Sequence, residues 1–230
     1  MTDLTDLLDI VRKRTVRRMR LSVDPRTGQI RLTLPERAPL GPALKWAEGH
    51  RGWIETQRSK LPEPWPIMPG MLVPYAGKDY WLDWLESHPR TPRIMGDMIC
   101  IGGPFEGMPA RLMRWLRREA RTVLDRETRE IAARGGHSVG KIGVGDPRSR
   151  WGSCSQAGDI RYSWRLILAP ADVRIATVAH EVAHRLHMDH SRAFHAEVKR
   201  LLGQDPKTAR HWLKTHGARL HWFGSGVGCS

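Results

Sequence analysis

Residues 170–195 read PADVRIATVAHEVAHRLHMDHSRAFH, and this stretch decides both the fold and the chemistry expected of the chain. Apolar residues recur through it at helical intervals, which is the pattern of an amphipathic helix. The stretch opens with Pro170 and Asp172, two residue types favoured in a first helical turn. The spacing therefore predicts a helix on which His180 and His184 share one face.

Residues His180, Glu181 and His184 have the spacing of a metal-binding pair with a neighbouring base. Side chains four residues apart on a helix lie about 6 Å from each other, so both imidazoles can reach one tetrahedral Zn²⁺ ion. Glu181 is rotated by one residue from His180, which leaves its carboxylate beside the ion rather than on it. A general base for a zinc-bound water is needed at that place.

A third ligand is expected from the histidines that follow, and His190 is the preferred candidate. It reaches the ion if the helix ends near Met188 and the chain turns back. His187 stays on the same helical face but rises about 10 Å above His180, too far for two ligands of one ion. His195 is expected on a next helix, over 192–203, and stays an alternative together with a distant carboxylate.

Upstream, residues 148–170 predict a hairpin, with a turn at 156–159 and a second strand over 160–168. A hairpin that leads directly into the histidine helix leaves an exposed strand edge beside the metal, and extended peptides bind such edges. Three side chains are candidates for stabilising an oxyanion: Arg148, Arg150 and His195. Nothing near Cys154 activates its thiol as a nucleophile, and zinc–water chemistry needs none.

The remaining chain predicts a mixture of strands and helices. An antiparallel hairpin is expected over 16–34, because alternating apolar residues flank a turn that contains Asp-Pro and Gly. One helix is expected over 41–61, and five prolines between 62 and 74 exclude regular structure there. Short strands should follow near 71–85 and 93–102, and then a long helix over 107–134 that ends at Gly135-Gly136.

The composition of the 230 residues is that of a globular protein, with 40% hydrophobic and 27% charged residues. No apolar run approaches the roughly 20 residues that cross a bilayer. The N-terminus carries acidic residues before its basic ones, which is the wrong charge order for a secretory signal. Three cysteines without C-x-x-C spacing support neither a disulfide framework nor a cysteine zinc site. A cytoplasmic protein is therefore expected.

The formal net charge is +14, and it is unevenly spread. Residues 1–100 hold 16 Lys and Arg against 12 Asp and Glu, whereas residues 101–230 hold 22 against 12. A basic surface attracts nucleic acid or other polyanions through a salt-sensitive field. Nevertheless, 30 of the 38 basic residues are Arg, which a bias in genome composition would also produce. Nucleic acid is thus a candidate partner on charge alone.

Three linked segments resemble the YgjP-like metallopeptidase family and, more distantly, the WLM and SprT-like zinc proteases. They are Arg150-Trp-Gly-Ser-Cys-Ser155, Trp164-Arg-Leu-Ile-Leu-Ala-Pro170, and His180-Glu-x-x-His184 with His190-Ser-x-x-Phe194. The resemblance implies a zincin-type catalytic domain with His180, His184 and His190 on zinc and Glu181 as base. This chain departs from the family pattern in having His195 where Trp is usual and Asp189 where Asn is usual.

The sequence is thus interpreted as an α+β protein whose β-rich N-terminal region, with one helix, spans 1–104. A zincin-like domain follows over 105–222 and a flexible tail over 223–230. Hydrolysis of peptide bonds by a zinc peptidase is the expected activity. Two alternatives stay open: a zinc hydrolase of phosphoanhydride or nucleic-acid-linked substrates, and a basic nucleic-acid-binding protein with a structural zinc. The oligomeric state is not predicted.

Overall fold

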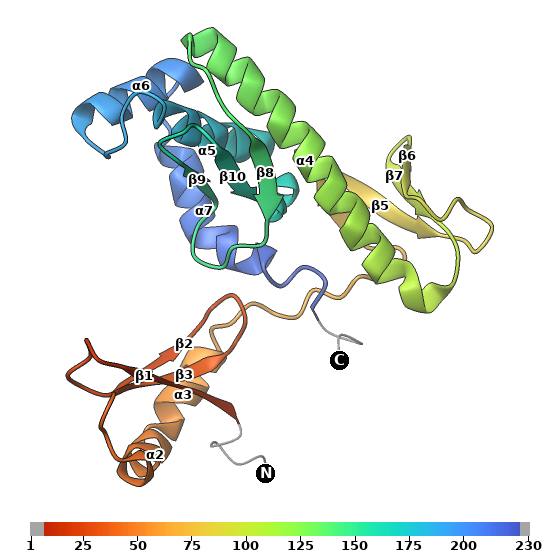
Figure 1. The fold of residues 1–230 in the computed structure, drawn as a ribbon. Helices are drawn as coiled ribbons and strands as arrows, with labels where there is room; N and C mark the ends of the chain where they lie inside the picture. The colour runs from red at the N-terminus through yellow and green to blue at the C-terminus, as the bar shows by residue number, and fades with distance from the viewer. Residues whose placement is uncertain (1–6, 226–230) are drawn as a thin grey trace. The chain divides into compact units, whose positions relative to one another are not determined.

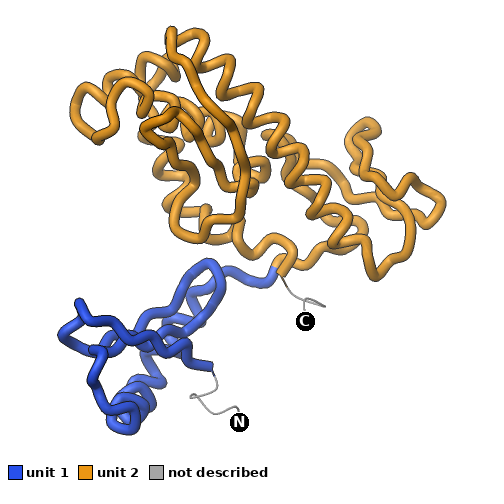
Figure 2. Tube along the Cα trace, in the orientation of Figure 1, with its two compact units in different colours: residues 1–64 blue, residues 65–230 orange. Residues whose placement is uncertain are grey.

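The structure, a computed structural model, describes residues 7–225 of the chain. It is an α+β protein, as predicted, and divides into two compact units, residues 1–64 and 65–230 (Figures 1 and 2). The division falls between Pro64 and Trp65, forty residues before the expected boundary at 104. The reason is packing, since the strands of residues 72–101 share a core with the long helix that follows them.

Unit 1 is a three-stranded sheet covered by two helices. Strands β1 (Leu8–Lys13), β2 (Arg20–Val23) and β3 (Ile30–Pro35) have the order β1-β3-β2. The predicted antiparallel hairpin is confirmed as β2 and β3, and β1 adds to β3 in parallel. The single helix expected over 41–61 is two, α2 (Leu40–Glu48) and α3 (Arg51–Arg58). They are separated at Gly49, a residue with a weak tendency to continue a helix.

Unit 2 begins with a four-stranded sheet. Strands β4 (Leu72–Tyr75), β5 (Lys78–Trp84), β6 (Arg93–Met95) and β7 (Met98–Ile101) have the order β4-β5-β7-β6. The short 3₁₀ helix η1 (Phe105–Gly107) then leads into α4 (Met108–Gly135). Buried residues of the sheet, such as Leu82 and Ile99, belong to one core with Leu112 and Leu116 of α4. The sheet lies beside the first half of this helix in Figure 1.

The second half of α4 supports the elements that follow it. The helix ends at Gly136, whose left-handed backbone, with φ at 72°, suits glycine. Strands β8 (Ile142–Gly145), β9 (Gly152–Cys154) and β10 (Ile160–Ser163) have the order β8-β10-β9. The predicted hairpin of β9 and β10 is confirmed, and β9 is an edge strand of this sheet. Residues Trp164–Leu168 form a 3₁₀ helix, η2, rather than the predicted continuation of the strand.

Three helices complete unit 2: α5 (Ala171–Ala183), α6 (Arg192–Leu202) and α7 (Lys207–Leu220). Helix α5 packs against α4, α6 and α7 (Figure 1). The prediction of a flexible tail over 223–230 does not hold for Phe223, which is 2% exposed and packs edge-on against Trp65. Residues 226–230 lie outside the described residues. None of the described helices is long and apolar enough to cross a membrane.

A buried ion pair joins α5 to α4. The Arg174 guanidinium donates from Nε and Nη2 to the two carboxylate oxygens of Glu127, at 2.8–3.2 Å, and the side chains are only 4% and 10% exposed. Removing two charges from water costs free energy that only close, hydrogen-bonded pairing offsets. The pair therefore fixes how α5 lies on α4.

We expect Glu127→Gln to lower the free energy of unfolding by about 3–5 kcal/mol, because it leaves the Arg174 cation buried without its counter-charge. The matched control is Asp125→Asn on the same helix, which breaks an exposed pair with Arg129 and should leave stability nearly unchanged. Urea denaturation followed by circular dichroism measures both. Equal effects of the two substitutions would contradict this role of the buried pair.

Candidate metal centre

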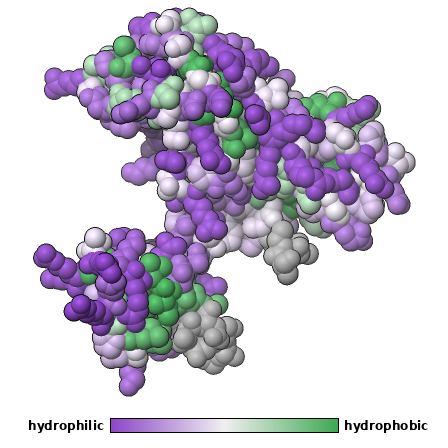
Figure 3. Space-filling model, viewed as in Figure 1, coloured by the Kyte–Doolittle hydropathy of each residue, from purple (hydrophilic) through white to green (hydrophobic). Residues whose placement is uncertain are grey.

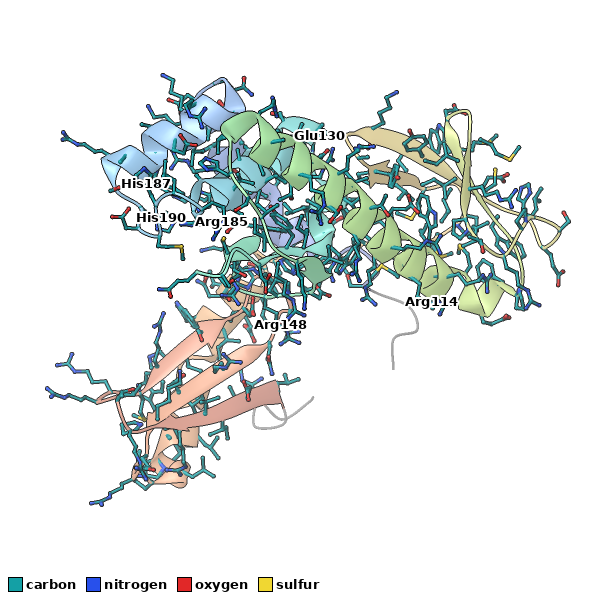
Figure 4. The ribbon with its side chains drawn as sticks, turned by 45° about the horizontal axis from the view of Figure 1, so that its top comes forward. Arg114, Glu130, Arg148, Arg185, His187 and His190 are labelled. Atoms are coloured by element: carbon teal, nitrogen blue, oxygen red, sulfur yellow. The ribbon has the colours of Figure 1, made fainter. Side chains whose placement is uncertain are left out.

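Three histidines converge where α5 ends and α6 begins. His180 lies on α5, His184 caps its C-terminus, and His190 lies in the loop before α6; Figure 4 labels His190 beside His187. One ligand atom from each of the three lies within 4.8 Å of the others. The Nε2 atoms of His180 and His190 are 3.2 Å apart. Two nitrogens bound to one tetrahedral zinc ion would lie about 3.3 Å apart, so the spacing fits such an ion.

The protonation of these imidazoles also suits metal binding, which requires a free nitrogen lone pair. Burial, together with the neighbouring His184 and His190, lowers the pKa of His180 to about 4, so this ring is neutral near pH 7. Burial also lowers the pKa of His184. The Nδ1 atom of His184 lies 3.0 Å from the carbonyl oxygen of His187, which can only accept. Nδ1 therefore donates and Nε2 keeps its lone pair for a metal.

Phe194 of α6 is the packing surface behind the cluster. Its ring is fully buried and its centroid lies 4.5–4.8 Å from the centroids of all three imidazoles. The helix is capped by Ser191, whose hydroxyl accepts from the Phe194 backbone N–H. His195 is the next residue on α6, at the position where the family usually has Trp. Its ring contacts the ring of Phe194, and it is not one of the three histidines of the cluster.

The chain reverses earlier than expected from the sequence. Helix α5 ends at Ala183, not near Met188, and a turn follows it. Arg185 holds this turn in place by donating to the carbonyl oxygens of Ser138 and Gln156; Figure 4 labels it. The early end of α5 gives the chain six residues to bring His190 back beside His180.

Glu181 lies beside the cluster with its carboxylate almost fully buried. It is 5% exposed, and burial raises its pKa to about 7, although Arg150 acts in the opposite direction. The side chain packs against Gly152 of the edge strand β9. A Cβ at Gly152 would come within 2.6 Å of the Glu181 Cγ and Cδ atoms. The glycine is therefore what leaves room for this carboxylate.

Two hollows meet at His180 and Glu181. The first, of about 250 Å³, has mostly apolar walls and is lined in part by Trp151, Val198 and Leu213. The second, of about 290 Å³, runs along β9 past His184 and His190. Three polar residues line both hollows: Arg150, His180 and Glu181.

Two of the three residues predicted to stabilise an oxyanion line the hollows beside the histidines. Arg150 lines both hollows and His195 lines the first, but Arg148 lines neither; Figure 4 labels Arg148. Burial raises the pKa of the Cys154 thiol, although Arg185 acts in the opposite direction. Arg210, which was not predicted from the sequence, comes from α7 and lines the first hollow. No local pattern connects α7 to this site.

The family model described as YgjP-like, metallopeptidase domain, matches residues 17–216 of the chain. The match covers most of the 230 residues, and the chain belongs to this family. It is accordingly a member of a metallopeptidase family with a histidine group able to bind a metal ion. No curated protein and no solved structure matches it.

We expect His190→Ala to lower the zinc content of the purified protein well below one ion per chain, because it removes one of three converging ligands. His187→Ala is the matched control, since its imidazole lies in the same loop outside the cluster, and its backbone carbonyl still accepts from His184. Elemental analysis of protein without a histidine tag measures both. Equal zinc in the two variants would exclude His190 as a ligand.

Proposed function

We propose that this protein is a zinc-dependent peptidase in which His180, His184 and His190 hold the ion and Glu181 is the general base. The observation that carries the proposal is the convergence of three imidazoles, two of them with lowered pKa values, next to a single buried carboxylate. Membership of a metallopeptidase family supports it.

The proposed chemistry divides between the ion and the chain. A zinc ion bound there supplies a Lewis acid that polarises a carbonyl group and acidifies water. Glu181 accepts the proton of the attacking water and passes it to the leaving amine. The absence of a side chain at Gly152 leaves room for the buried Glu181 carboxylate beside the histidines, which supports this role. Arg150 is the candidate for stabilising the oxyanion, since it lines the junction of both hollows.

Peptide binding is supported by the edge strand and by the first hollow. Strand β9 pairs with β10 on one side, and its residues line the hollow that contains the histidines. An extended peptide can add to such an edge through backbone hydrogen bonds. The apolar hollow of about 250 Å³ beside Glu181 would then receive one apolar side chain of the substrate.

The ligand count favours a catalytic over a structural zinc. Structural zinc sites are usually closed by four protein ligands, whereas catalytic sites keep one position open. Within residues 7–225, no fourth His, Cys, Asp or Glu side chain joins the three histidines in the cluster. The alternative of a nucleic-acid-binding protein with structural zinc lacks this support.

We expect Glu181→Gln to keep its zinc and to lose about 10²–10⁴-fold in the rate of peptide hydrolysis, because the amide cannot accept the proton. The measurement is cleavage of a quenched fluorescent peptide library by zinc-loaded wild type and variant. Hydrolysis at the wild-type rate by the Glu181→Gln protein would overturn the mechanism.

We expect Gly152→Ala to reduce hydrolysis at least tenfold without loss of zinc, because the new methyl group displaces the Glu181 carboxylate. Gly143→Ala on β8 of the same sheet is the control, since a Cβ there meets nothing within 4 Å among the described residues. Rates and zinc content are measured on the same preparations. Wild-type rates in both variants would show that the position of Glu181 does not limit turnover.

A further inference from the structure

A pocket of about 540 Å³ lies at the start of α4, outside the histidine site. Four arginines line it, Arg90 from the loop between β5 and β6 and Arg111, Arg114 and Arg118 from α4, and none of its lining residues is acidic. We call it the arginine pocket. In Figure 4, Arg114 lies well apart from His190.

The backbone around the pocket is built to hold two of these arginines. Arg90 packs on Gly103, where a Cβ would come within 3.0 Å of its Cγ and where the backbone has φ at +81°. Arg111 packs on Gly107, where a Cβ would lie 2.7 Å from its Nη1 atom. Arg111 is held further by a 2.7 Å hydrogen bond from Nη2 to the carbonyl oxygen of Pro104.

The positive charge of the pocket is largely uncompensated. Within residues 7–225, Arg118 alone among the four has a carboxylate within ion-pair distance, that of Glu119 at 3.7 Å. The Nε atom of Arg111 is buried, and no described group accepts a hydrogen bond from it. A buried donor without an acceptor costs free energy, so the hydrogen-bonding capacity of the Arg111 guanidinium is only partly used by the protein.

We propose that the arginine pocket binds phosphate groups, presented either by a free polyphosphate or by the backbone of a nucleic acid. Guanidinium groups donate two parallel hydrogen bonds to phosphate oxygens, and one phosphate can accept from several arginines at once. Four cations in one pocket match the charge of two or three linked phosphates better than that of isolated carboxylates. Hydrophilic residues also cover most of the unit 2 face drawn in Figure 3.

The pocket is independent of the proposed peptidase site. It shares no lining residue with either hollow beside His180 and Glu181. Binding at the arginine pocket can therefore be tested whether or not the protein hydrolyses peptides.

The test is titration calorimetry of the full chain with inorganic tripolyphosphate at about 150 mM salt, where attraction between distant exposed charges is screened. The pocket variant is Arg114→Gln with Arg118→Gln. The matched control, Arg117→Gln with Arg121→Gln, removes two exposed arginines with the same spacing from the same helix, outside the pocket. We expect binding by the wild type, at least tenfold weaker binding by the pocket variant, and a dissociation constant within twofold of wild type for the control.

Competition with a single-stranded oligonucleotide separates the two sources of phosphate. Displacement of tripolyphosphate by the oligonucleotide indicates a nucleic-acid backbone, and failure to displace it indicates a free polyphosphate. Zinc chelation by tripolyphosphate would give a signal that persists in the pocket variant. Such a persistent signal would overturn the proposal, and so would absence of binding to the wild type or equal losses of binding in both double variants. A polyglutamate peptide, which offers carboxylates in place of phosphates, should bind more weakly than tripolyphosphate; tighter binding of the peptide would also overturn the proposal.

Discussion

The buried ion pair of Arg174 and Glu127 is the constraint on which the geometry of unit 2 depends. Both charges are out of water, and only the paired arrangement of donors and oxygens compensates their desolvation. A rotation of α5 about its own axis would break these hydrogen bonds, and it would also move His180 and Glu181 on this helix and His184 at its C-terminus. A contact about two turns away from the histidines thus restrains the rotation of the helix that carries them.

Much of this arrangement could be predicted, because helical spacing alone places His180 and His184 together. The hairpin before them follows from alternation and a glycine-containing turn, and the structure confirms its pairing. The pairing of β8 with β10 could not be predicted, since parallel partners far apart in sequence leave no local pattern. The role of Phe194 was not predicted for a different reason: a phenylalanine on a helix predicts burial, but not that three imidazoles pack against it.

Two of the expectations that differ from the structure depended on local pattern without its tertiary context. The histidine helix was expected to continue to Met188, but Arg185 ties the following turn to neighbouring carbonyl oxygens. The domain boundary was expected at residue 104, just before α4, but the sheet before that point and the helix after it share one core. Shared burial of Leu82 with Leu112 keeps the first sheet of unit 2 with the long helix.

The ring of Phe194 contacts all three imidazoles. The entropy lost in gathering these ligands is therefore part of the cost of folding, not of ion capture. In small zinc domains the chain assembles only around its metal, so that chelation and unfolding are one event. Here the three imidazoles pack against a buried phenylalanine of the core, so they come together as α5 and α6 fold against each other.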